Sequence, residues 1–509
     1  MAKYETNIAI VGGGASGLAA AVYAAQKGES VIVIEKMGVC GGCGNMAAGV
    51  LAYQSHLQRE AQETMTVEEG FRRHMEFTHY RANAPLTKRV FERSSELISW
   101  LEDLGVEFAG VYKNHPSGQR VWHIVKVPGG TGPVDRAASI MMKALTDKAS
   151  SLGVQFLFNT EGKEILMEDG CAVGVLAQNE KGQRIEVLAD AVIVATNGFQ
   201  ADSPMGKDLF GDRWLGEAVV GGHPIPGLTG DGMRMLWKAG TAKAPLSMSF
   251  RTAINGVSDK FETLHSVMTQ FGLIVDLSGR RVMNEEYAQD PEFLGQQLVL
   301  AQDHKLFSIV DTEQLERYSS GGLDWFHPLQ TVKKLKNWAS ELETFEEEQS
   351  IFEEDDPEFA EFFEEVNMEP GNFWVCESIE EIAEKTGIDA TQMRKTIEAY
   401  NADAGRTDRL FFKRAEYMDP VRKAPFYVAA HTITALESRG GVLTDEDMRC
   451  LRKDHRAIPG LYCTGTDANS IMGDAASFHR IFGASLTFAM TSAMIAVDDI
   501  SRYFEEEFD

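Results

Sequence analysis

The sequence predicts an α/β protein in which a domain with a parallel β-sheet is interrupted by a second, α+β domain. Three observations predict this fold class. The chain opens with a strand, a glycine-rich turn, a helix and a second strand; apolar runs of strand length recur within 154–196 and at 458–466; and from about residue 250 to 436 long polar helices replace them. We therefore expect a first domain formed by residues 1–249 and 437–509, with residues 250–436 inserted into it.

The first 36 residues predict a strand, a helix and a parallel strand. Asn7–Val11 and Ser30–Ile34 are apolar runs, and Ala15–Lys27 is predicted to be the helix between them. Two strands joined through a helix lie parallel in one sheet. Further strands at Val154–Phe158, in the run CAVGVLA and at Ala191–Thr196 are expected to extend or flank this sheet.

Helix signals follow in several places. Thr66 and Glu69 have the spacing of a capping box, which predicts a helix start. One apolar helix face ends before Gly105 and consists of Leu97, Ile98, Leu101 and Leu104. Another, in the inserted domain, consists of Met393, Ile397 and Tyr400. Gly483–Val497 is predicted to be a helix whose small residues allow close approach to another backbone or to a flat ligand.

The chain of 509 residues has a net charge of −27, which argues against nucleic acid or an anionic membrane surface as the main partner. The charge is unevenly spread, because Glu341–Glu369 holds 14 acidic residues and no Lys or Arg, interleaved with phenylalanines. Two interpretations of this acidic segment remain open. It is either a solvated helical face with its phenylalanines packed inward, or a docking surface for a basic electron-transfer partner.

The six cysteines are few and scattered, which indicates reduced thiols in the cytoplasm and not a disulfide framework. Cys40 and Cys43 form the one C-x-x-C, and Gly44 follows where attachment of a c-type haem needs histidine. No secretory leader is expected before Thr6, no apolar run is long enough to span a bilayer, and no metal site is predicted.

The first turn has the spacing G-x-G-x-x-G, formed by Gly12, Gly14 and Gly17. These glycines allow a tight turn, close approach of the backbone to a pyrophosphate, and close packing of the helix on the strand. Glu35 lies at the end of the second strand, where a carboxylate can accept both ribose hydroxyls of an adenosine. The motif therefore predicts a dinucleotide site; the alternative is a glycine turn that only packs.

Later segments resemble one known family. They are the second glycine turn, EKMGVCGGCGNMAAGV, then AVIVATNGF, GLTGDGMRMLWKAG, GLIVDLSGRRVMNEE, IEAYNADAGRTDRLF, PFYVAAHTITALESRGGVLTDEDMR, IPGLYCTGT and HRIFGASLTFAM. In this order they resemble the flavoproteins of the fumarate reductase and succinate dehydrogenase family over nearly the whole chain. The acidic segment is the least alike. The resemblance implies a Rossmann-like FAD-binding domain, with residues 250–436 as a capping domain that closes over the substrate.

The resemblance also implies which residues hold FAD. Glu35, with Lys36 beside it, is expected at the adenosine ribose. The expected pyrophosphate contacts, together with the packing glycine of the turn, are Gly12, Gly13, Gly14, Ala15, Ser16 and Gly17. Those near the isoalloxazine are Gly41, Gly42, Asn45, Ala47 and Gly49, and those on the adenine side are Thr196, Gly198 and Asp231. The last helix begins with Gly483, Ala484, Ser485 and Leu486, and its N-terminus is expected to face the flavin C2 carbonyl.

Two contacts stay open. After Gly465 the family has a glutamate for the ribityl chain; here Thr466 stands in that place and Asp467 follows, and either could serve. Membrane-bound relatives link FAD to a histidine near the second glycine turn, where Cys43 falls in this chain. A thioether at Cys43 is one interpretation; a small buried thiol beside noncovalent FAD, as in soluble members, is the one favoured here.

The chain departs from the family at the dicarboxylate site. Gln289 stands where relatives have a proton-donating arginine, and an amide cannot relay a proton in that way. The two substrate histidines are replaced, one by the FRT run at 250–252 and the other by Glu437. Arg480 alone matches. Fumarate and succinate are therefore not the expected substrates.

Other residues are candidates for the missing chemistry. Tyr287 and Glu437 are the candidate proton donors, although Tyr287 could equally be an aromatic residue packed in the cap. Arg480 is expected to hold a carboxylate or carbonyl oxygen of the substrate, with His479 behind it. Arg439 and Arg251 could provide a new anion contact.

The sequence thus predicts an FAD-dependent oxidoreductase that reduces an activated C=C bond of an organic acid, aromatic enoate or ketone, or runs the reverse dehydrogenation. No second dinucleotide motif is found, since the 129–132 glycine cluster lacks strand–turn–helix context, so the electrons are expected from a protein or a small carrier such as reduced flavin. Two alternatives are a 3-ketosteroid dehydrogenase-like enzyme and an electron-transfer flavoprotein subunit of a larger complex.

Overall fold

The computed structural model describes most of the chain. The described residues are 2–113, 119–129, 137–200, 203–211, 219–220, 223–224, 227–253, 268–269, 272–288, 291–314, 373–468, 470–473 and 481–508. Several features singled out in the sequence lie outside this described part, namely Gln289, His479, Arg480, the acidic segment 341–369, most of the 129–132 glycine cluster and the side chain of Arg251.

The chain divides into two compact units. Unit 1 comprises Met1–Val220, Pro224–Ser249 and Leu436–Asp509, and unit 2 comprises Gly221–His223 and Phe250–Ala435. Two long strands, β12 (Lys243–Ala253) and β16 (Phe426–Val442), each contain a boundary between the units. The chain therefore leaves unit 1 and returns to it through strands.

The described part of unit 1 is built on an eight-stranded sheet made of β1 (Ala2–Val11), β2 (Val31–Ile34), β6 (Gln155–Leu157), β7 (Thr160–Glu168), β8 (Cys171–Asn179), β9 (Arg184–Val194), β17 (Arg449–Leu451) and β18 (Ala457–Cys463). The strand order is β17-β18-β9-β1-β2-β6, and β8 pairs with both β9 and β7. β1 lies parallel to β2 and β9, β2 to β6, and β9 to β18. Because β18, β9, β1, β2 and β6 are parallel, the α/β class predicted from the sequence is confirmed. The sheet is mixed, since β7 pairs with β8, β8 with β9, and β17 with β18 in antiparallel fashion.

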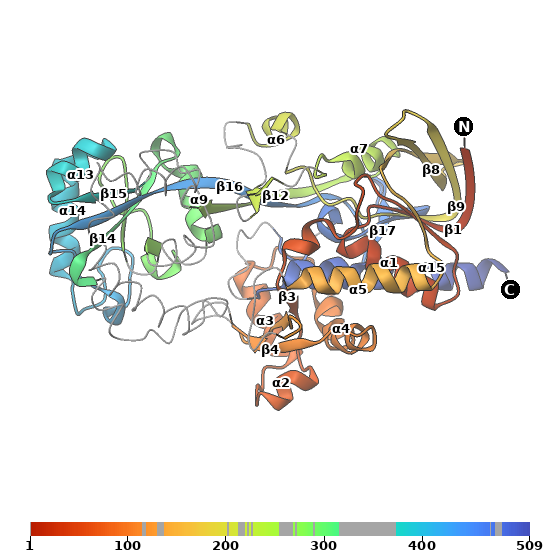
Figure 1. Ribbon diagram of the computed structural model, residues 1–509, viewed down its shortest axis with the longest axis horizontal. Helices are drawn as coiled ribbons and strands as arrows, with labels where there is room; N and C mark the ends of the chain where they lie inside the picture. Colours follow the sequence, from red (N-terminus) through yellow and green to blue (C-terminus); the bar gives the residue numbers. More distant parts are fainter. Residues whose placement is uncertain are drawn as a thin grey trace. The chain divides into compact units, whose positions relative to one another are not determined.

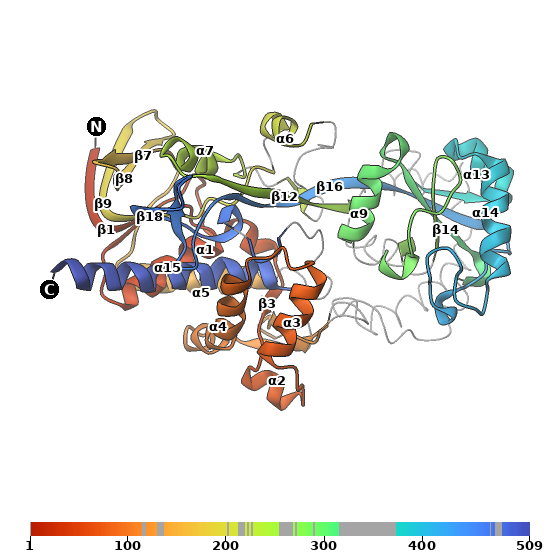
Figure 2. The same cartoon turned by 180° about the vertical axis from the view of Figure 1, so that it is seen from behind.

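Several long helices of unit 1 pack against one another, namely α1 (Ala15–Gln26), α4 (Ala84–Asp103), α5 (Ala138–Ser151) and α15 (Ala484–Phe508). α1 contacts α5 and α15, and α15 also contacts α4. Figures 1 and 2 show α1, α5 and α15 side by side along the sheet. α1 is rich in alanine and buried along most of its length, since small side chains let neighbouring helices approach closely.

Smaller elements complete unit 1. An antiparallel sheet has the order β3-β5-β4, with β3 (Gly49–Leu51), β4 (Phe108–Tyr112) and β5 (Trp122–Val125). The shorter helices and strands are α2 (His56–Glu60), α3 (Val67–Phe77), α6 (Ser203–Phe210), α7 (Asp231–Lys238) and β10 (Val219–Val220). The two-residue strand β11 (His223–Pro224) contains another boundary between the units. The helix start predicted at Thr66 is confirmed, because its side chain accepts a 3.1 Å hydrogen bond from the amide of Glu69.

Unit 2 contains a sheet with the order β12-β16-β14-β13, and β15 also pairs with β16. Its other elements are β13 (Leu273–Asp276), β14 (Leu306–Asp311), β15 (Phe373–Cys376), α9 (Pro291–Leu300), α13 (Ile379–Thr386), α14 (Ala390–Ala402) and the short turns η3 (Glu285–Tyr287), η4 (Gln302–His304) and η6 (Ala415–Tyr417). The predicted apolar face of α14 is buried in the core of this unit, with Met393 0%, Ile397 6% and Tyr400 2% exposed. Together the two units confirm the α/β class with an inserted α+β segment.

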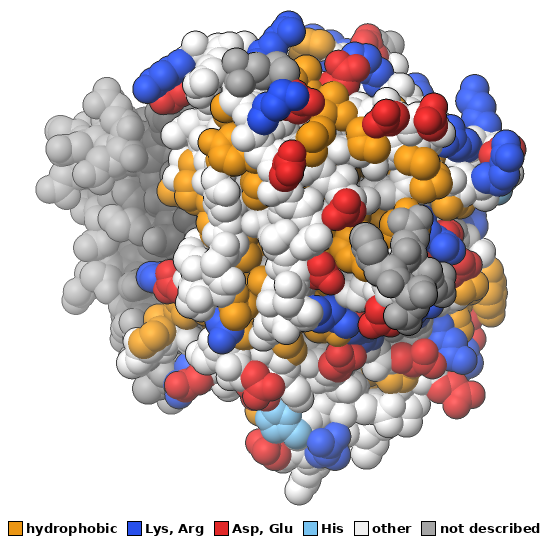
Figure 3. Space-filling model, turned by 90° about the vertical axis from the view of Figure 1, so that its right-hand side faces the viewer, with side chains coloured by type: hydrophobic (Ala, Val, Ile, Leu, Met, Phe, Trp, Pro, Cys, Tyr) orange, Lys and Arg blue, Asp and Glu red, His pale blue; other side chains and the backbone are white. Residues whose placement is uncertain are grey.

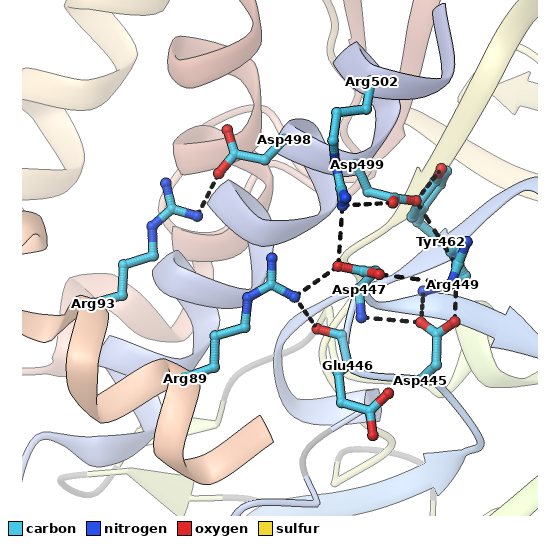
Figure 4. A network of polar contacts seen from close by, with 10 residues as sticks. All are labelled: Arg89, Arg93, Asp445, Glu446, Asp447, Arg449, Tyr462, Asp498, Asp499 and Arg502. Atoms are coloured by element: carbon cyan, nitrogen blue, oxygen red, sulfur yellow. Dashed lines mark hydrogen bonds and ion pairs between the residues drawn. The ribbon is translucent and has the colours of Figure 1, made fainter. Parts of the chain in front are cut away.

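Two elements are longer than the sequence predicts, because polar residues extend them. β1 begins at Ala2, since Ala2–Thr6 pair with Ile185–Ala189 of β9 although they form no apolar run. α15 continues past Val497 to Phe508. Figure 4 shows why the polar end of α15 stays ordered: Asp498 and Asp499 form ion pairs with arginines, and Tyr462 donates a 3.0 Å hydrogen bond to Asp499.

The surface carries both signs of charge. On the face shown in Figure 3, acidic and basic side chains are interspersed with apolar ones. Exposed ion pairs of unit 1, such as Arg72–Glu76 and Lys238–Glu164, contribute little to stability. Within the described residues, no helix is long and apolar enough to cross a membrane. The same residues contain no group of three or more His, Cys, Asp and Glu side chains that could hold a metal ion.

Candidate functional site

The first glycine turn joins β1 to α1. Gly12 has a φ of +103°, and a Cβ there would lie 2.5 Å from the carbonyl oxygen of Ala195. A Cβ on Gly17 would lie 1.8 Å from the carbonyl oxygen of Gly12, so only glycine lets α1 approach the turn this closely. A Cβ on Gly14 would meet no atom within 4 Å. The outer glycines therefore shape the turn, while the space beside Gly14 is open.

The start of α1 offers hydrogen-bond donors to that open space. Gly14 is the N-cap and supplies no side-chain cap, and the first turn contains no acidic residue. The first N–H groups of a helix have no intrahelical partner and carry the positive end of the helix dipole. Ser16 donates its hydroxyl to Thr464 Oγ1 at 2.8 Å, so its backbone amide, and not its hydroxyl, is the group of Ser16 that can donate to an anion. This arrangement suits a phosphate.

Glu35 lies directly after β2 and reaches the first turn. Its Oε2 accepts a 2.6 Å hydrogen bond from the amide of Gly13, and its Oε1 accepts one of 2.7 Å from the amide of Met37. Burial raises the pKa of this carboxyl group, and the two backbone hydrogen bonds oppose the rise. Each carboxylate oxygen has a second lone pair, so the fixed group can still accept hydroxyl donors from a ligand.

Residues expected on the adenine side lie together. Lys36 Nζ donates to Thr229 Oγ1 at 2.6 Å and pairs with Asp231 Oδ2 at 2.8 Å. Asp231 begins α7, and a Cβ on the next residue, Gly232, would lie 1.9 Å from Thr196 Oγ1. The ends of β2 and β9 and the start of α7 therefore converge in unit 1.

The second glycine turn lies directly on the first. Gly41 donates its amide to the carbonyl of Gly13 at 2.8 Å and forms an isolated parallel bridge with Gly14. The turn continues as η1 (Gly42–Met46), where Asn45 donates its side-chain amide to a carbonyl of the same turn at 3.2 Å. Expected pyrophosphate and isoalloxazine contacts are thus neighbours in space.

Cys43 lies half-buried in this second turn. Burial raises the pKa of its thiol to about 12; the charge of Glu437 adds to the rise, and a hydrogen bond from Asn197 opposes it. Nucleophilic sulfur is the thiolate, which needs a lowered pKa. These surroundings keep the thiol protonated at neutral pH and so disfavour a covalent bond to a cofactor.

Asp467 closes the turn that follows β9. Its Oδ1 accepts a 2.6 Å hydrogen bond from the amide of Gly198, and its Oδ2 accepts one of 3.0 Å from Thr196 Oγ1. The side chain is buried, and burial raises its pKa to about 6, against the effect of these two donors. The carboxylate is thus directed at protein donors, whereas Thr466 beside it remains half-buried.

Asn197, between the two donors to Asp467, was not singled out in the sequence. Its φ is +61°, in the left-handed region that asparagine tolerates better than most residues. Its side-chain Oδ1 is buried and has no hydrogen-bond partner among the described residues. A buried acceptor without a partner is rare in folded proteins, which makes it a candidate ligand contact. The signal in the sequence was an asparagine just before Gly198 at the end of a strand.

The start of α15 gathers three predicted site residues. Ser485 donates its hydroxyl to Glu437 Oε1 at 2.6 Å, and Arg439 donates from Nε to the same oxygen at 2.7 Å. Gly483 precedes the helix with a φ of +85°, and a Cβ there would lie 2.6 Å from the amide of Leu51. Leu486 is buried in the following turn. Residues that the sequence identified separately therefore form one cluster within unit 1.

The other candidate proton donor, Tyr287, lies in unit 2 at the end of η3. It is half-buried, and its ring packs against Phe293 with centroids 5.7 Å apart. The neighbouring Glu286 forms an ion pair with Arg414. The described structure thus contains both proposed proton donors, each in a different unit, while the predicted Arg480, His479 and Gln289 lie outside it.

Two observations within unit 1 fit an extended dinucleotide. The backbone at Gly14 borders open space at a helix start, as a diphosphate requires. The buried acceptor of Asn197 lies next to Cys43 in the second turn, where a polar ring system would supply a donor.

Comparisons with known proteins agree. A vinyl phenol reductase of Lactiplantibacillus plantarum is 28% identical over 489 residues, which cover 93% of this chain and 92% of that protein. A fumarate reductase (cytochrome) of Shewanella frigidimarina is 22% identical, over 99% of this chain and 78% of its own length. Among solved structures, a 3-ketosteroid-Δ4-(5α)-dehydrogenase of Rhodococcus jostii RHA1 has the same fold, with a TM-score of 0.73, 20% identity and 97% of each chain covered.

The family match extends through both units. Residues 7–478 fit the model of the FAD binding domain family, which confirms the flavoprotein resemblance seen in the sequence motifs. The chain belongs to the FAD binding domain family and is an FAD-dependent oxidoreductase.

Proposed function

We propose that this chain reduces an activated C=C bond of an organic acid, an aromatic enoate or an enone, or runs the reverse dehydrogenation, and that fumarate itself is not its substrate. One observation carries the proposal. The two glycine turns and Glu35 are joined by hydrogen bonds within unit 1. Asn197, in the turn after β9, forms a hydrogen bond with Cys43 of the second glycine turn, which supports one extended FAD site. The names of the two relatives cited above, both reductases, support the reaction class.

Bound FAD supplies hydride transfer. The chain's own residues hold and orient it: Glu35 accepts the adenosine ribose hydroxyls, and the amides of Ala15 and Ser16 bind the pyrophosphate. The raised pKa of Cys43 supports noncovalent attachment. The remaining proposed contacts are Gly12, Gly14, Gly17, Lys36, Gly41, Gly42, Cys43, Asn45, Ala47, Gly49, Thr196, Gly198, Asp231, Gly465, Thr466, Ser485 and Leu486.

Reduction of C=C also requires a proton. We assign it to Tyr287 and not to Glu437, because Glu437 is engaged as a carboxylate in an ion pair with Arg439. Arg480, supported by His479, is proposed to hold a carbonyl or carboxylate oxygen of the substrate, on the family resemblance alone. Gln289 takes no proton-relay role in this scheme.

The test is anaerobic. Purified flavoprotein is reduced with dithionite and mixed with fumarate, urocanate, aryl acrylates, 4-vinylphenol and enones, while flavin reoxidation is followed by absorbance. We expect rapid reoxidation by an aryl alkene or enone and slow reoxidation by fumarate. Fumarate as the fastest acceptor would overturn the substrate assignment. In a second assay that starts from oxidised flavoprotein, reduction of the flavin by a 3-ketosteroid would instead favour the steroid enzyme, to whose fold this chain is similar.

The compartment and the electron donor belong to the same proposal. All six cysteines are free, which supports a reducing compartment, and we propose the cytoplasm. The electrons are proposed to come from a donor protein or from reduced free flavin. Copurification with such a partner and the absence of turnover alone would favour an electron-transfer subunit.

A further inference from the structure

Glu437 is held by two donors that act on the same oxygen. Oε1 accepts from Arg439 Nε at 2.7 Å and from Ser485 Oγ at 2.6 Å. Oε2 accepts no hydrogen bond from any residue that the structure describes. The group is therefore fixed by one oxygen and keeps the lone pairs of the other for a ligand or for water.

The ion pair has a buried positive end and a more accessible negative end. The Arg439 side chain is 0% exposed, whereas the Glu437 side chain is 14% exposed. Because its carboxylate is at the more accessible end of the pair, Glu437 presents negative charge to an approaching ligand. Burying a carboxylate without a donor is costly, so an approaching molecule gains by supplying an O–H or N–H group.

This cluster, formed by Glu437, Arg439 and Ser485, lies beside the second glycine turn. The negative charge of Glu437 reaches Cys43 in that turn, and Ser485 is the second residue of α15. These elements are the ones proposed above to surround the isoalloxazine, so the inference rests on the proposed function. Substrate must come near that ring for hydride transfer.

We propose that Glu437, oriented by Arg439 and Ser485, is a specificity-determining residue that selects an unsaturated substrate bearing a neutral hydroxyl at this end and rejects one bearing a carboxylate there. A hydroxyl donates to Oε2 and satisfies it. A substrate carboxylate offers no donor and faces a like charge at short range in a poorly solvated site. The substrate class is thus an alkene that carries a hydroxyl and no carboxylate at the Glu437 end, as a vinyl phenol or a hydroxylated aryl enoate or enone does, and not a dicarboxylate.

The test compares three alkenes that differ only in the para substituent of one ring: 4-vinylphenol, 4-vinylbenzoate and styrene. The full-length holoprotein is reduced anaerobically, and kcat/KM is obtained from flavin reoxidation. We expect 4-vinylphenol to exceed 4-vinylbenzoate by about 100-fold and styrene to fall between them. Equal rates for the phenol and the benzoate, or a preference for the benzoate, would overturn the proposal.

Variants identify the residue responsible. In Glu437→Gln the preference for the phenol over the benzoate should shrink at least about tenfold, and in Arg439→Met, which leaves the carboxylate without its counter-charge, it should grow. Ser485→Ala removes one of the two donors that orient Glu437. Its preference for the phenol over the benzoate should therefore lie between those of the wild type and Glu437→Gln. Glu164→Gln, at an exposed ion pair of unit 1, is the matched control and should keep the wild-type ratio.

Folding and cofactor binding are controlled separately. Glu437→Gln removes the carboxylate from a buried guanidinium, so the double variant Glu437→Gln/Arg439→Met is measured beside it. If these variants keep the wild-type ratio of kcat/KM for the phenol over the benzoate, the specificity role is overturned. It is also overturned if the Glu437→Gln protein folds but has lost FAD, because the residue then serves the cofactor. If no alkene of the wider panel reoxidises wild-type flavin, the proposed function itself fails, which is a different result from reduction without discrimination.

Discussion

The Asp467 carboxylate accepts a 2.6 Å hydrogen bond from the amide of Gly198, 269 residues earlier in the chain. The same carboxylate accepts from Thr196 Oγ1, so it closes the turn after β9 from both sides. This turn also carries Asn197, whose buried Oδ1 has no partner within the described structure. Asp467 therefore connects the C-terminal part of unit 1 to the turn that presents this candidate ligand contact.

Asp467 makes the stability of the protein depend on pH. Burial raises its pKa from 3.8 to about 6, so between these values the native state holds a proton that the unfolded chain has released. The contribution of Asp467 to the free energy of unfolding is therefore fully present below about pH 4. It is lost as pH rises through 6, which lowers stability by up to roughly 3 kcal/mol. Urea unfolding of wild type and Asp467→Asn between pH 4 and 7.5 measures the effect.

The unfolding free energies of wild type and Asp467→Asn, measured against pH, test whether Asp467 titrates in this range. The difference in unfolding free energy between wild type and Asp467→Asn should fall as pH rises from 4 to 6.5 and stay constant above that. Parallel curves across the whole range would show that Asp467 does not titrate in this window.

Elements with local signals were predictable from the sequence. The first glycine turn was found because its requirements lie within six residues: Gly12 and Gly17 leave no room for a Cβ. β1 was predicted too short, because Ala2–Thr6 are stabilised by pairing with β9 and show no apolar run. Likewise the polar end of α15 depends on partners from distant parts of the chain, such as Arg93.

The candidate site was predictable in its members but not in their contacts. Glu437, Arg439 and Ser485 were each singled out, yet the hydrogen bond from Ser485 to Glu437 joins α15 to β16 across 48 residues. The hydrogen bonds that Asp467 accepts from Gly198 and Thr196 could not be predicted for the same reason. Side-chain orientation across such separations depends on packing, which periodicity and spacing do not encode. Asn197 was missed although asparagine in a strand-ending turn is a recognisable signal.

Gly14→Ala should separate cofactor binding from folding. The new Cβ meets no protein atom within 4 Å and the φ of −76° is ordinary, so the apoprotein should keep wild-type stability within about 0.5 kcal/mol. The methyl group enters the space proposed for the pyrophosphate, so the FAD dissociation constant should rise at least about tenfold. Flavin content and fluorescence titration of the apoprotein measure this change.

Two further glycines are the controls for that variant. Gly12→Ala combines a φ of +103° with a contact of 2.5 Å to a backbone oxygen and should destabilise the fold itself. Gly28→Ala has a φ of +95° but open surroundings, so it should cost about 1 kcal/mol and leave FAD affinity unchanged. Full FAD affinity in Gly14→Ala would remove that position from the cofactor site.

Glu35→Gln should weaken FAD binding through the ribose. The carboxylate accepts from the amides of Gly13 and Met37, and an amide side chain turns its NH2 group toward one of these two donors. Losing charge-assisted hydrogen bonds to the backbone and to the ribose should raise the FAD dissociation constant about 10- to 100-fold. Isothermal titration of the apoprotein measures this, with the exposed Glu5→Gln as control; equal affinities for both variants would contradict the ribose role.

Unit 2 contains a buried charge cluster formed by Arg281, Glu285, Asp408, Lys413 and the hydroxyl of Tyr400. Lys413 is fully buried, donates to Tyr400 Oη at 2.7 Å and lies 3.6 Å from Glu285 Oε2. Arg281 pairs with the same Glu285 oxygen at 2.7 Å and with Asp408 at 2.9 Å. Burial lowers the pKa of Lys413, and the charge of Glu285 opposes that change. The cluster fixes Glu285, the first residue of the η3 turn that ends at Tyr287.

Lys413→Met tests whether this cluster stabilises unit 2 or only orders it. Removing one charge from a buried network leaves its partners imperfectly compensated and typically costs about 3 kcal/mol, whereas Arg72→Ala, at an exposed pair with Glu76, should cost less than about 1 kcal/mol. Urea unfolding followed by circular dichroism measures both. FAD content should be unchanged in either folded variant, because the proposed cofactor contacts all lie in unit 1. An unchanged or higher midpoint for Lys413→Met would show that apolar packing replaces the charge without loss of stability.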